Sequence, residues 1–243
     1  MRTLFATTGR ILRQLRHDKR TVGLLIVVPS LLLTLLYYMF KDIPSLFDRL
    51  ALTMLGIFPF LVMFLITSIA MLRERTTGTL ERLLTTPLRK TDLLFGYGIA
   101  FGLAAAVQAS VVSAVAYLFL DMDTNGSPGF VILIAIANAV LGVALGLLAS
   151  AFAKTEFQAV QFMPVVVLPQ VLLCGLFVAR ESMAGWLQAI SDVLPLTYSV
   201  EALQEVGMFA EPTGTMWRDL AIVGGAVIVA LIAAAGTLRR RTP

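Results

Sequence analysis

Six long apolar runs, separated by short polar connections, dominate the pattern of the chain. In a helix, which rises about 1.5 Å per residue, roughly 20 apolar residues cross the hydrocarbon core of a bilayer. The predicted spans are Val22–Phe40, Leu50–Leu72, Leu93–Leu120, Gly129–Ala153, Phe157–Ala179 and Leu220–Leu238. The pattern therefore predicts an all-α integral membrane fold with six transmembrane helices, in a single transmembrane domain over residues 1–243.

Lys and Arg are distributed unevenly between the two sets of connections. Residues 1–21, 73–92, the loop after the fourth run and the C-terminal segment together hold fifteen of them, whereas the other three connections hold four. Basic residues are enriched on the cytoplasmic side of membrane proteins. We therefore expect a multi-pass protein of a bacterial-type plasma (inner) membrane, with both termini cytoplasmic and 180–219 as the long external connection.

The segment before the first run has the pattern of an amphipathic helix. One face of the helical wheel holds Leu4, Phe5, Thr8, Ile11, Leu12 and Leu15. The opposite face holds Arg10, Arg13, Arg16 and Arg20. Such a helix can lie in the inner headgroup layer, with its arginines among lipid phosphates. Residues 1–21 are therefore expected to form a cytoplasmic, interfacial amphipathic helix that contacts membrane lipid; a basic anchor with no further role is the alternative.

Composition agrees with a membrane protein and excludes several other classes. The chain is 58% hydrophobic and 14% charged, with a mean hydropathy of +0.87. The formal charge of +4 comes from short basic blocks beside apolar runs, which indicates membrane orientation rather than nucleic-acid binding. With one cysteine, Cys174, and one histidine, His17, a disulfide framework or a Cys/His metal cluster is excluded.

Small residues one helical turn apart occur in two of the runs. Gly98-x-x-x-Gly102 and Gly142-x-x-x-Gly146 would allow close approach between helices in lipid. Two interpretations remain open, a dimer interface and packing within one chain, and the second is the commoner use.

The sequence contains no convincing catalytic constellation. The runs carry no ionisable residue away from their ends. This argues against proton antiport, because a proton that crosses the membrane needs a protonatable side chain near the middle of the bilayer. No Gly-Lys pair occurs, so a phosphate-cradling Walker A loop is missing. We expect no enzyme activity and no cofactor or metal bound by this chain; if ATP powers the protein, ATP and Mg are bound by another chain.

The loop RERTTGTLERLLTTPLRKTD, residues 73–92, carries the most information. Leu80, Leu83 and Leu84 form an apolar stripe, and Pro87 ends the short helix that they predict. An apolar stripe in a short inner loop needs a surface to cover it, either the headgroup layer or a partner protein.

This loop resembles the cytoplasmic loop of ABC-2-type permeases, in particular the branch typified by daunorubicin-resistance exporters. The matching residues are Glu74, Gly78, Thr79, Leu80, Glu81, Leu83, Leu84, Thr86 and Pro87. The external stretch LPLTYSVEAL is similar to a second family pattern, through Pro195, Leu196, Thr197, Tyr198, Glu201, Ala202 and Leu203. The order of the spans also agrees, so the resemblance covers essentially the whole chain.

The resemblance implies an ABC-2/ABCG-like exporter membrane domain that works as a half-transporter. Its partners would be a second permease subunit, identical or homologous, and an ABC ATPase subunit that docks on the loop. The implied ATPase-coupling residues are Arg73, Glu74, Arg75, Gly78, Thr79, Leu80, Glu81, Leu83, Leu84 and Pro87. The alternative is a positive-inside anchor whose leucines rest on lipid.

In related exporters the second and fifth spans line the substrate path. The corresponding candidates are Phe58, Phe64, Phe162, Gln170, Cys174 and Phe177. Aromatic rings with few hydrogen-bonding groups favour an amphipathic drug or a lipid-like substrate over a charged sugar or an ion. Core packing or contact with lipid is the rival explanation for any one of them.

Two other functions stay open at this point. A transporter driven by an ion gradient would carry an intramembrane ionisable residue, which the runs lack. A non-transporting scaffold or immunity protein would bind a partner without any dependence on an ATPase.

Overall fold

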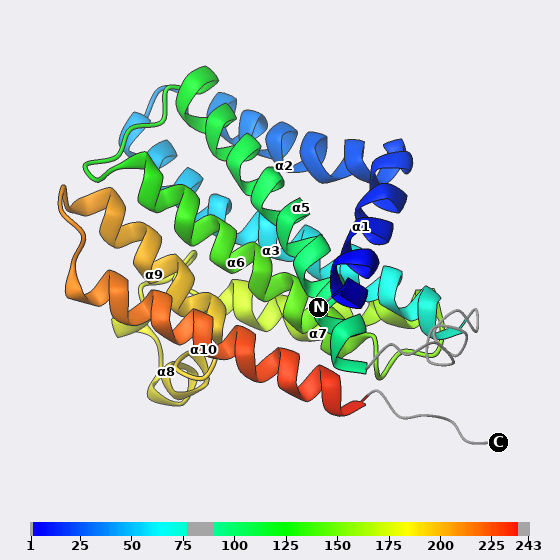
Figure 1. Ribbon diagram of the computed structural model, residues 1–243. Coiled ribbons are helices and arrows are strands. Elements are labelled where there is room, and N and C mark those ends of the chain that lie inside the picture. The colour runs from blue at the N-terminus through cyan, green and yellow to red at the C-terminus, as the bar shows by residue number, and fades with distance from the viewer. Residues whose placement is uncertain (1, 77–89, 238–243) are drawn as a thin grey trace.

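The computed structural model describes residues 2–76 and 90–237, which form helices joined by short connections (Figure 1). The helices are α1 (Arg2–His17), α2 (Lys19–Phe40), α3 (Pro44–Thr76), α5 (Lys90–Phe119), α6 (Pro128–Ala149), α7 (Glu156–Leu173), η1 (Arg180–Ser182), α8 (Gly185–Ser191), α9 (Pro195–Met208) and α10 (Gly214–Thr237). No strand occurs among these described residues.

Six of the described helices are long and apolar enough to cross a membrane, which confirms the predicted fold class. They are α2, α3, α5 from Phe95 onward, α6, α7 and α10. Four of them, α3, α6, α7 and α10, differ from the predicted runs by four or more residues at an end. Helix α3 begins at Pro44, before the predicted Leu50, because proline is favoured in the first turn of a helix. Helix α7 ends at Leu173, before the predicted Ala179, because Gly175 adopts a φ of +94°.

Helices α3 and α6 cross at the centre of the bundle, and glycines let their backbones approach. A Cβ atom at Gly142 would collide with the carbonyl oxygen of Phe60, and one at Gly146 would lie 2.6 Å from the carbonyl oxygen of Phe64. Only glycine fits this crossing. The Gly142-x-x-x-Gly146 motif therefore serves packing within the chain.

Helix α9 inserts into the bundle and packs on α3, α6 and α10. Its buried positions include Leu196, Val200 and Leu203. Asn138 of α6 connects it to α3, because its amide donates to the carbonyl oxygen of Gly56 (2.5 Å) and its oxygen accepts from the hydroxyl of Ser199 (2.9 Å). At about 1.5 Å per residue, the 14 residues of α9 are too short to cross a bilayer, so this buried helix is not a seventh span.

Helix α1 lies across the end of the bundle, at a steep angle to α2 (Figure 1). It crosses α5 closely, since a Cβ atom at Gly96 would come within 2.9 Å of the side chain of Thr7. Ile11 is buried, and Leu12 and Leu15 pack on the same apolar cluster. Protein therefore covers much of the apolar face that was expected to rest on lipid.

Candidate coupling junction and translocation path

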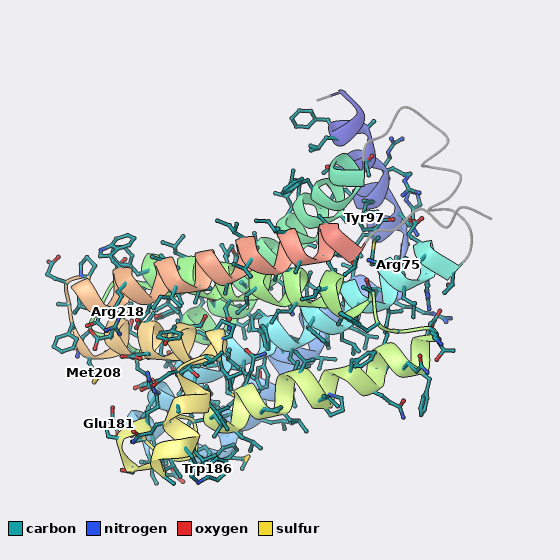
Figure 2. The ribbon with its side chains drawn as sticks, turned by 90° about the horizontal axis from the view of Figure 1, so that it is seen from below. Arg75, Tyr97, Glu181, Trp186, Met208 and Arg218 are labelled. Atoms are coloured by element: carbon teal, nitrogen blue, oxygen red, sulfur yellow. The ribbon has the colours of Figure 1, made fainter. Side chains whose placement is uncertain are left out.

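The bundle has two chemically different ends (Figure 2). We call the end at which α3 stops and α5 starts the junction end, and the opposite end the distal end. Arg75 and Tyr97 lie at the junction end, whereas Trp186, Met208 and Arg218 lie at the distal end.

The last turn of α3 makes a polar contact with α7. Arg73 forms a two-pronged ion pair with Glu156, with Nε 2.7 Å from Oε1 and Nη2 3.0 Å from Oε2. Glu156 is also in the first turn of α7, where the helix dipole favours an acid. Both side chains are more than half exposed, so the pair fixes geometry more than it adds stability.

The next residue, Glu74, pairs with α1 and is connected to α5 through the same arginine. Its Oε1 atom lies 3.3 Å from Nη2 of Arg10 on α1, and the same nitrogen donates to the hydroxyl of Tyr97 on α5 (3.1 Å). The Glu74 side chain is only 10% exposed, and its Oε2 atom has no hydrogen-bond partner among the described residues.

Arg75 completes the set by reaching α10. Its Nη2 atom donates to the hydroxyl of Thr237 at 3.4 Å. Successive residues of a helix point about 100° apart, so three adjacent side chains can reach three directions. Residues Arg73, Glu74 and Arg75, which we call the coupling junction, thereby connect the end of α3 to α7, α1, α5 and α10.

Seven of the ten predicted coupling residues follow the last described turn of α3. Gly78, Thr79, Leu80, Glu81, Leu83, Leu84 and Pro87 lie outside the described residues. The three coupling residues that the structure does describe are the coupling junction itself.

The candidate path residues fall in three places. Phe64 and Cys174 are buried in one apolar cluster, against which Phe58 packs. Gln170 is also buried. Its amide nitrogen donates to the carbonyl oxygen of Val166, and its amide oxygen accepts from the backbone N–H of Leu196 at the start of α9.

Two candidates lie apart from this cluster. Phe162 packs, half-buried, on Leu72 and Ala159 nearer the junction end. Phe177 follows α7 and is 67% exposed. The structure thus brings together Phe58, Phe64 and Cys174, and separates Phe162 and Phe177 from them.

Helix α7 is peripheral and leaves one broad face uncovered in the single chain. After Glu156, the exposed residues of α7 are Phe157, Gln158, Val160, Gln161, Pro164, Val165, Leu168, Pro169 and Leu172. Two of them are amides: Gln158, in the first turn, accepts a hydrogen bond from the backbone of Lys154, and Gln161 lies one turn further along the helix. A polar group that faces lipid is costly, so this face is suited to contact another protein surface or a polar substrate.

A network of charged residues joins the distal segments. Arg180 pairs with Glu201 (2.6 Å) and with Asp192, and Arg218 pairs with Glu201 (3.3 Å) and Asp219 (2.8 Å). The network connects η1, α8 and α9 to the start of α10. It provides a defined position for the long connection that contains α9.

Sequence reasoning missed this network and the insertion of α9. Oppositely charged residues at 180, 192, 201 and 218 in one connection were the available signal, but their pairing depends on the tertiary fold. For Asn138 the signal was an amide within an apolar run, which in a membrane helix commonly bonds to a neighbouring helix.

No group of three or more His, Cys, Asp or Glu suited to a metal ion occurs over residues 2–76 and 90–237. The polar contacts of both ends are ion pairs and hydrogen bonds between helices. They can position and couple helices, which is mechanical rather than catalytic work.

Comparison with known proteins places these features in a family. The family model described as ABC-2 type transporter matches residues 2–208. The "Probable multidrug ABC transporter permease YbhR" of Escherichia coli (strain K12) is 26% identical over 156 residues, which is 64% of this chain and 42% of that protein. The "Inner membrane transport permease YhhJ" of the same strain is 30% identical over 172 residues, 66% of this chain and 44% of the relative.

A eukaryotic protein is also similar. The "ABC transporter G family member 20" of Dictyostelium discoideum is 26% identical over 159 residues, 65% of this chain and 22% of that protein. The matches span less than half the length of these curated relatives. The family model covers most of the chain, including the coupling junction and α9. The six apolar helices among the described residues make the chain a multi-pass membrane protein. The chain therefore belongs to the ABC-2 type transporter family.

Proposed function

We propose that this chain is a membrane-spanning permease subunit of an ATP-binding-cassette exporter. A separate ABC ATPase subunit, with ATP and Mg, would dock at the loop between α3 and α5, and a second permease subunit would complete the pathway. The substrate would be an amphipathic drug or a lipid-like molecule, moved out of the cytoplasm or the inner leaflet.

The coupling junction is the observation that carries this proposal. Its residues directly precede the segment in which the family resemblance places the docking helix; they contact α1, α7 and α10, and reach α5 through Arg10. A displacement of the loop would be transmitted to most of the bundle at once. A passive anchor would not need such connections.

Coupling would work through a shift between two arrangements of the helices. Closure of the ATPase pair would move the loop, and Arg73 and Arg75 would carry that movement into α7 and α10. These are peripheral helices with few buried positions, so they can move without breaking the α3–α6 crossing.

In this proposal the junction end faces the cytoplasm of a bacterial-type inner membrane. The basic side chains of α1 and of residues 73–92 support this orientation, because basic loops stay on the cytoplasmic side. Trp186 and Trp217, both exposed at the distal end, would then lie at the outer interface.

The substrate class rests on the candidate path. Phe58, Phe162 and Phe177 are at least partly exposed, and the uncovered face of α7 is apolar apart from Gln158 and Gln161. Such a lining favours an apolar body with few polar groups. An efflux assay tests it: export of hydrophobic drugs is expected, and export of a small hydrophilic solute alone would contradict it.

Docking is tested by purifying the tagged chain from membranes of its host and identifying bound proteins by mass spectrometry. An ABC ATPase is expected with the wild type and is expected to be lost from a Leu83→Asp, Leu84→Asp variant. Val193→Asp is the matched control, since Val193 is 80% exposed at the distal end and receives the same charge.

Three outcomes would count against the proposal. Retention of the ATPase by the double variant would place docking elsewhere. Recovery of a partner that binds no nucleotide would favour a scaffold, and transport that stops with an uncoupler while ATP remains would favour an ion-driven transporter.

A further inference from the structure

A cavity of about 440 Å³ lies at the junction end, between α1, α2, α3 and α5. Its volume is within the range of about 300–1,000 Å³ that is usual for small-molecule sites. One part of the lining is apolar and consists of Ile11, Leu15, Ile66, Ile69, Ala70 and Phe101. The other part is polar and consists of Gln14, Asp18, Thr21, Arg73, Glu74 and Tyr97.

The polar part carries an acid with unused hydrogen-bonding capacity. Glu74 is buried, and while its Oε1 atom faces Arg10, its Oε2 atom lacks a partner within the described residues. A buried carboxylate oxygen without a partner is costly, so this atom is suited to accept a hydrogen bond from a ligand.

The charges of the lining favour a cation over an anion. Asp18 adds a second carboxylate, and hydrogen bonds from Thr21 hold the pKa of Asp18 below its usual range, so Asp18 is ionised at neutral pH. The lining base is Arg73, whose guanidinium already forms the two-pronged pair with Glu156.

The aromatic rings support the same choice. Tyr97 and Phe101 line the cavity with their centroids 6.1 Å apart, and ring faces attract ammonium groups. The remaining apolar side chains would contact a hydrocarbon body.

We infer that this cavity is a binding site for an amphipathic ammonium compound, whose ammonium group contacts Glu74 and whose apolar body lies along Ile66, Ile69 and Phe101. Two sources have this chemistry, the headgroup of phosphatidylethanolamine from the bilayer and a free amphipathic amine. The site is distinct from the candidate path on α3 and α7, and it does not depend on the proposed export function.

The position of the site gives it a consequence. A ligand that bonds to Glu74 competes with Arg10 for the same carboxylate and thus acts on the contact between α3 and α1.

Octylamine and octanol are the probes, because they share a chain and differ in charge. Purified wild-type protein in detergent, without ATP or any ATPase, is titrated with each, and the melting temperature is followed. Saturable stabilisation is expected with octylamine and not with octanol. Glu74→Gln is expected to weaken octylamine binding by about tenfold or more, since hydrogen bonds to charged groups contribute about 1.5–3 kcal/mol.

Two further variants complete the test. Glu211→Gln, at an exposed position in the connection before α10, is the charge control and should bind octylamine as the wild type does. Ala70→Phe should block the cavity without touching an ion pair, and it carries the test if Glu74→Gln is not monodisperse. Equal effects of octylamine and octanol, or equal octylamine affinity of wild type and the cavity variants, would overturn the inference.

Native mass spectrometry separates the two sources. Phosphatidylethanolamine retained by the wild type and lost from Glu74→Gln supports the lipid as ligand. Saturable octylamine binding without retained phosphatidylethanolamine supports a free amine. Because the permease is measured alone, a negative result here leaves the export proposal untouched.

Discussion

At the scale of residues, two glycines decide how closely the central helices approach. Gly142 and Gly146 face the backbone of Phe60 and Phe64, where any Cβ atom would collide with a carbonyl oxygen. The sequence predicted close packing from the spacing of these glycines. It could not predict the partner helix, because the backbone of many helices can pack closely against a row of glycines.

Gly142→Ala is expected to lower the stability of the protein by about 1–3 kcal/mol, because overpacking forces α3 and α6 apart. The measurement is the thermal or denaturant midpoint of the detergent-solubilised protein. Gly225→Ala is the control, since a Cβ atom at Gly225 of α10 meets nothing within 4 Å. Equal loss in both variants would contradict the close crossing.

Asn138 is the second decisive residue, because it bonds to both α3 and α9. Asn138→Ala is expected to destabilise the protein by about 1–2 kcal/mol, the range found for hydrogen bonds between helices in membrane model systems. Ser199→Ala should cost less when Asn138 is already Ala, because the two share one bond. Strict additivity in this double-mutant cycle would show that the pair does not interact.

At the scale of elements, the coupling junction connects helices through contacts that are partly exposed. Sequence reasoning selected Glu74 from the family pattern, and Arg73 and Arg75 as basic residues of the loop that could orient docking. It could not give their partners Glu156, Arg10 and Thr237, which are 83, 64 and 162 residues away along the chain. Such partners follow only from the packing of the helices.

Arg73→Ala is expected to change the melting temperature little, because an exposed ion pair contributes about 0–1 kcal/mol. Substrate-stimulated ATPase activity of the reconstituted complex is expected to fall, since the contact between α3 and α7 is lost. The charge swap Arg73→Glu with Glu156→Arg should restore part of that activity. A swap no better than Arg73→Glu alone would argue against this contact as a transmission element.

The distal charge network provides the other contact between elements. Glu201→Gln weakens the attraction of Glu201 for both Arg180 and Arg218, so amide exchange in residues 180–208 is expected to quicken. Hydrogen exchange with mass spectrometry measures this change. Glu211→Gln should leave exchange in that segment unaltered, and identical profiles for both variants would mean that the network does not hold α9.

Proline marks several helix starts in the structure, as at Pro44 and Pro128, but the apolar runs alone did not locate them all, since α3 was expected to begin at Leu50. The buried position of α9 could not be predicted either. Helix α8 lies at the surface, with Trp186 68% exposed, whereas α9 is buried. The hydroxyls of α9 bond to Ser191 of α8 and to Asn138 of α6, so the polarity of α9 does not indicate a surface position.

At the scale of the whole molecule, the number of apolar helices and the fold class were predictable because bilayer thickness sets the length of each span. Which apolar residues contact lipid, the substrate path or a partner protein was not predictable, since an apolar side chain is compatible with all three surroundings. The uncovered face of α7 illustrates this point. Gln161, an exposed amide beyond the first turn of α7, is the feature that distinguishes it from a face suited to lipid.

A second permease subunit is expected to cover this face, because burial against protein can satisfy the amide. In a Cys174→Ala background, Gln161→Cys should form a disulfide-linked dimer in membranes. Val229→Cys is the control, since Val229 is 67% exposed on the apolar face of α10. Equal cross-linking of both would indicate random collision rather than an interface.

The insertion of α9 also has a consequence for biosynthesis. This helix packs against α3 and α6, which precede it in the chain, and against α10, which follows it. The centre of the bundle is therefore incomplete until α9 and α10 have been made, and the hydrogen bond between Asn138 and the carbonyl of Gly56 is enclosed only when α9 packs over it. A nascent chain that stalls within α7 presents this unfinished centre to the quality-control proteases of the membrane, so slow translation after Leu173 should reduce yield more than slow translation before Pro128.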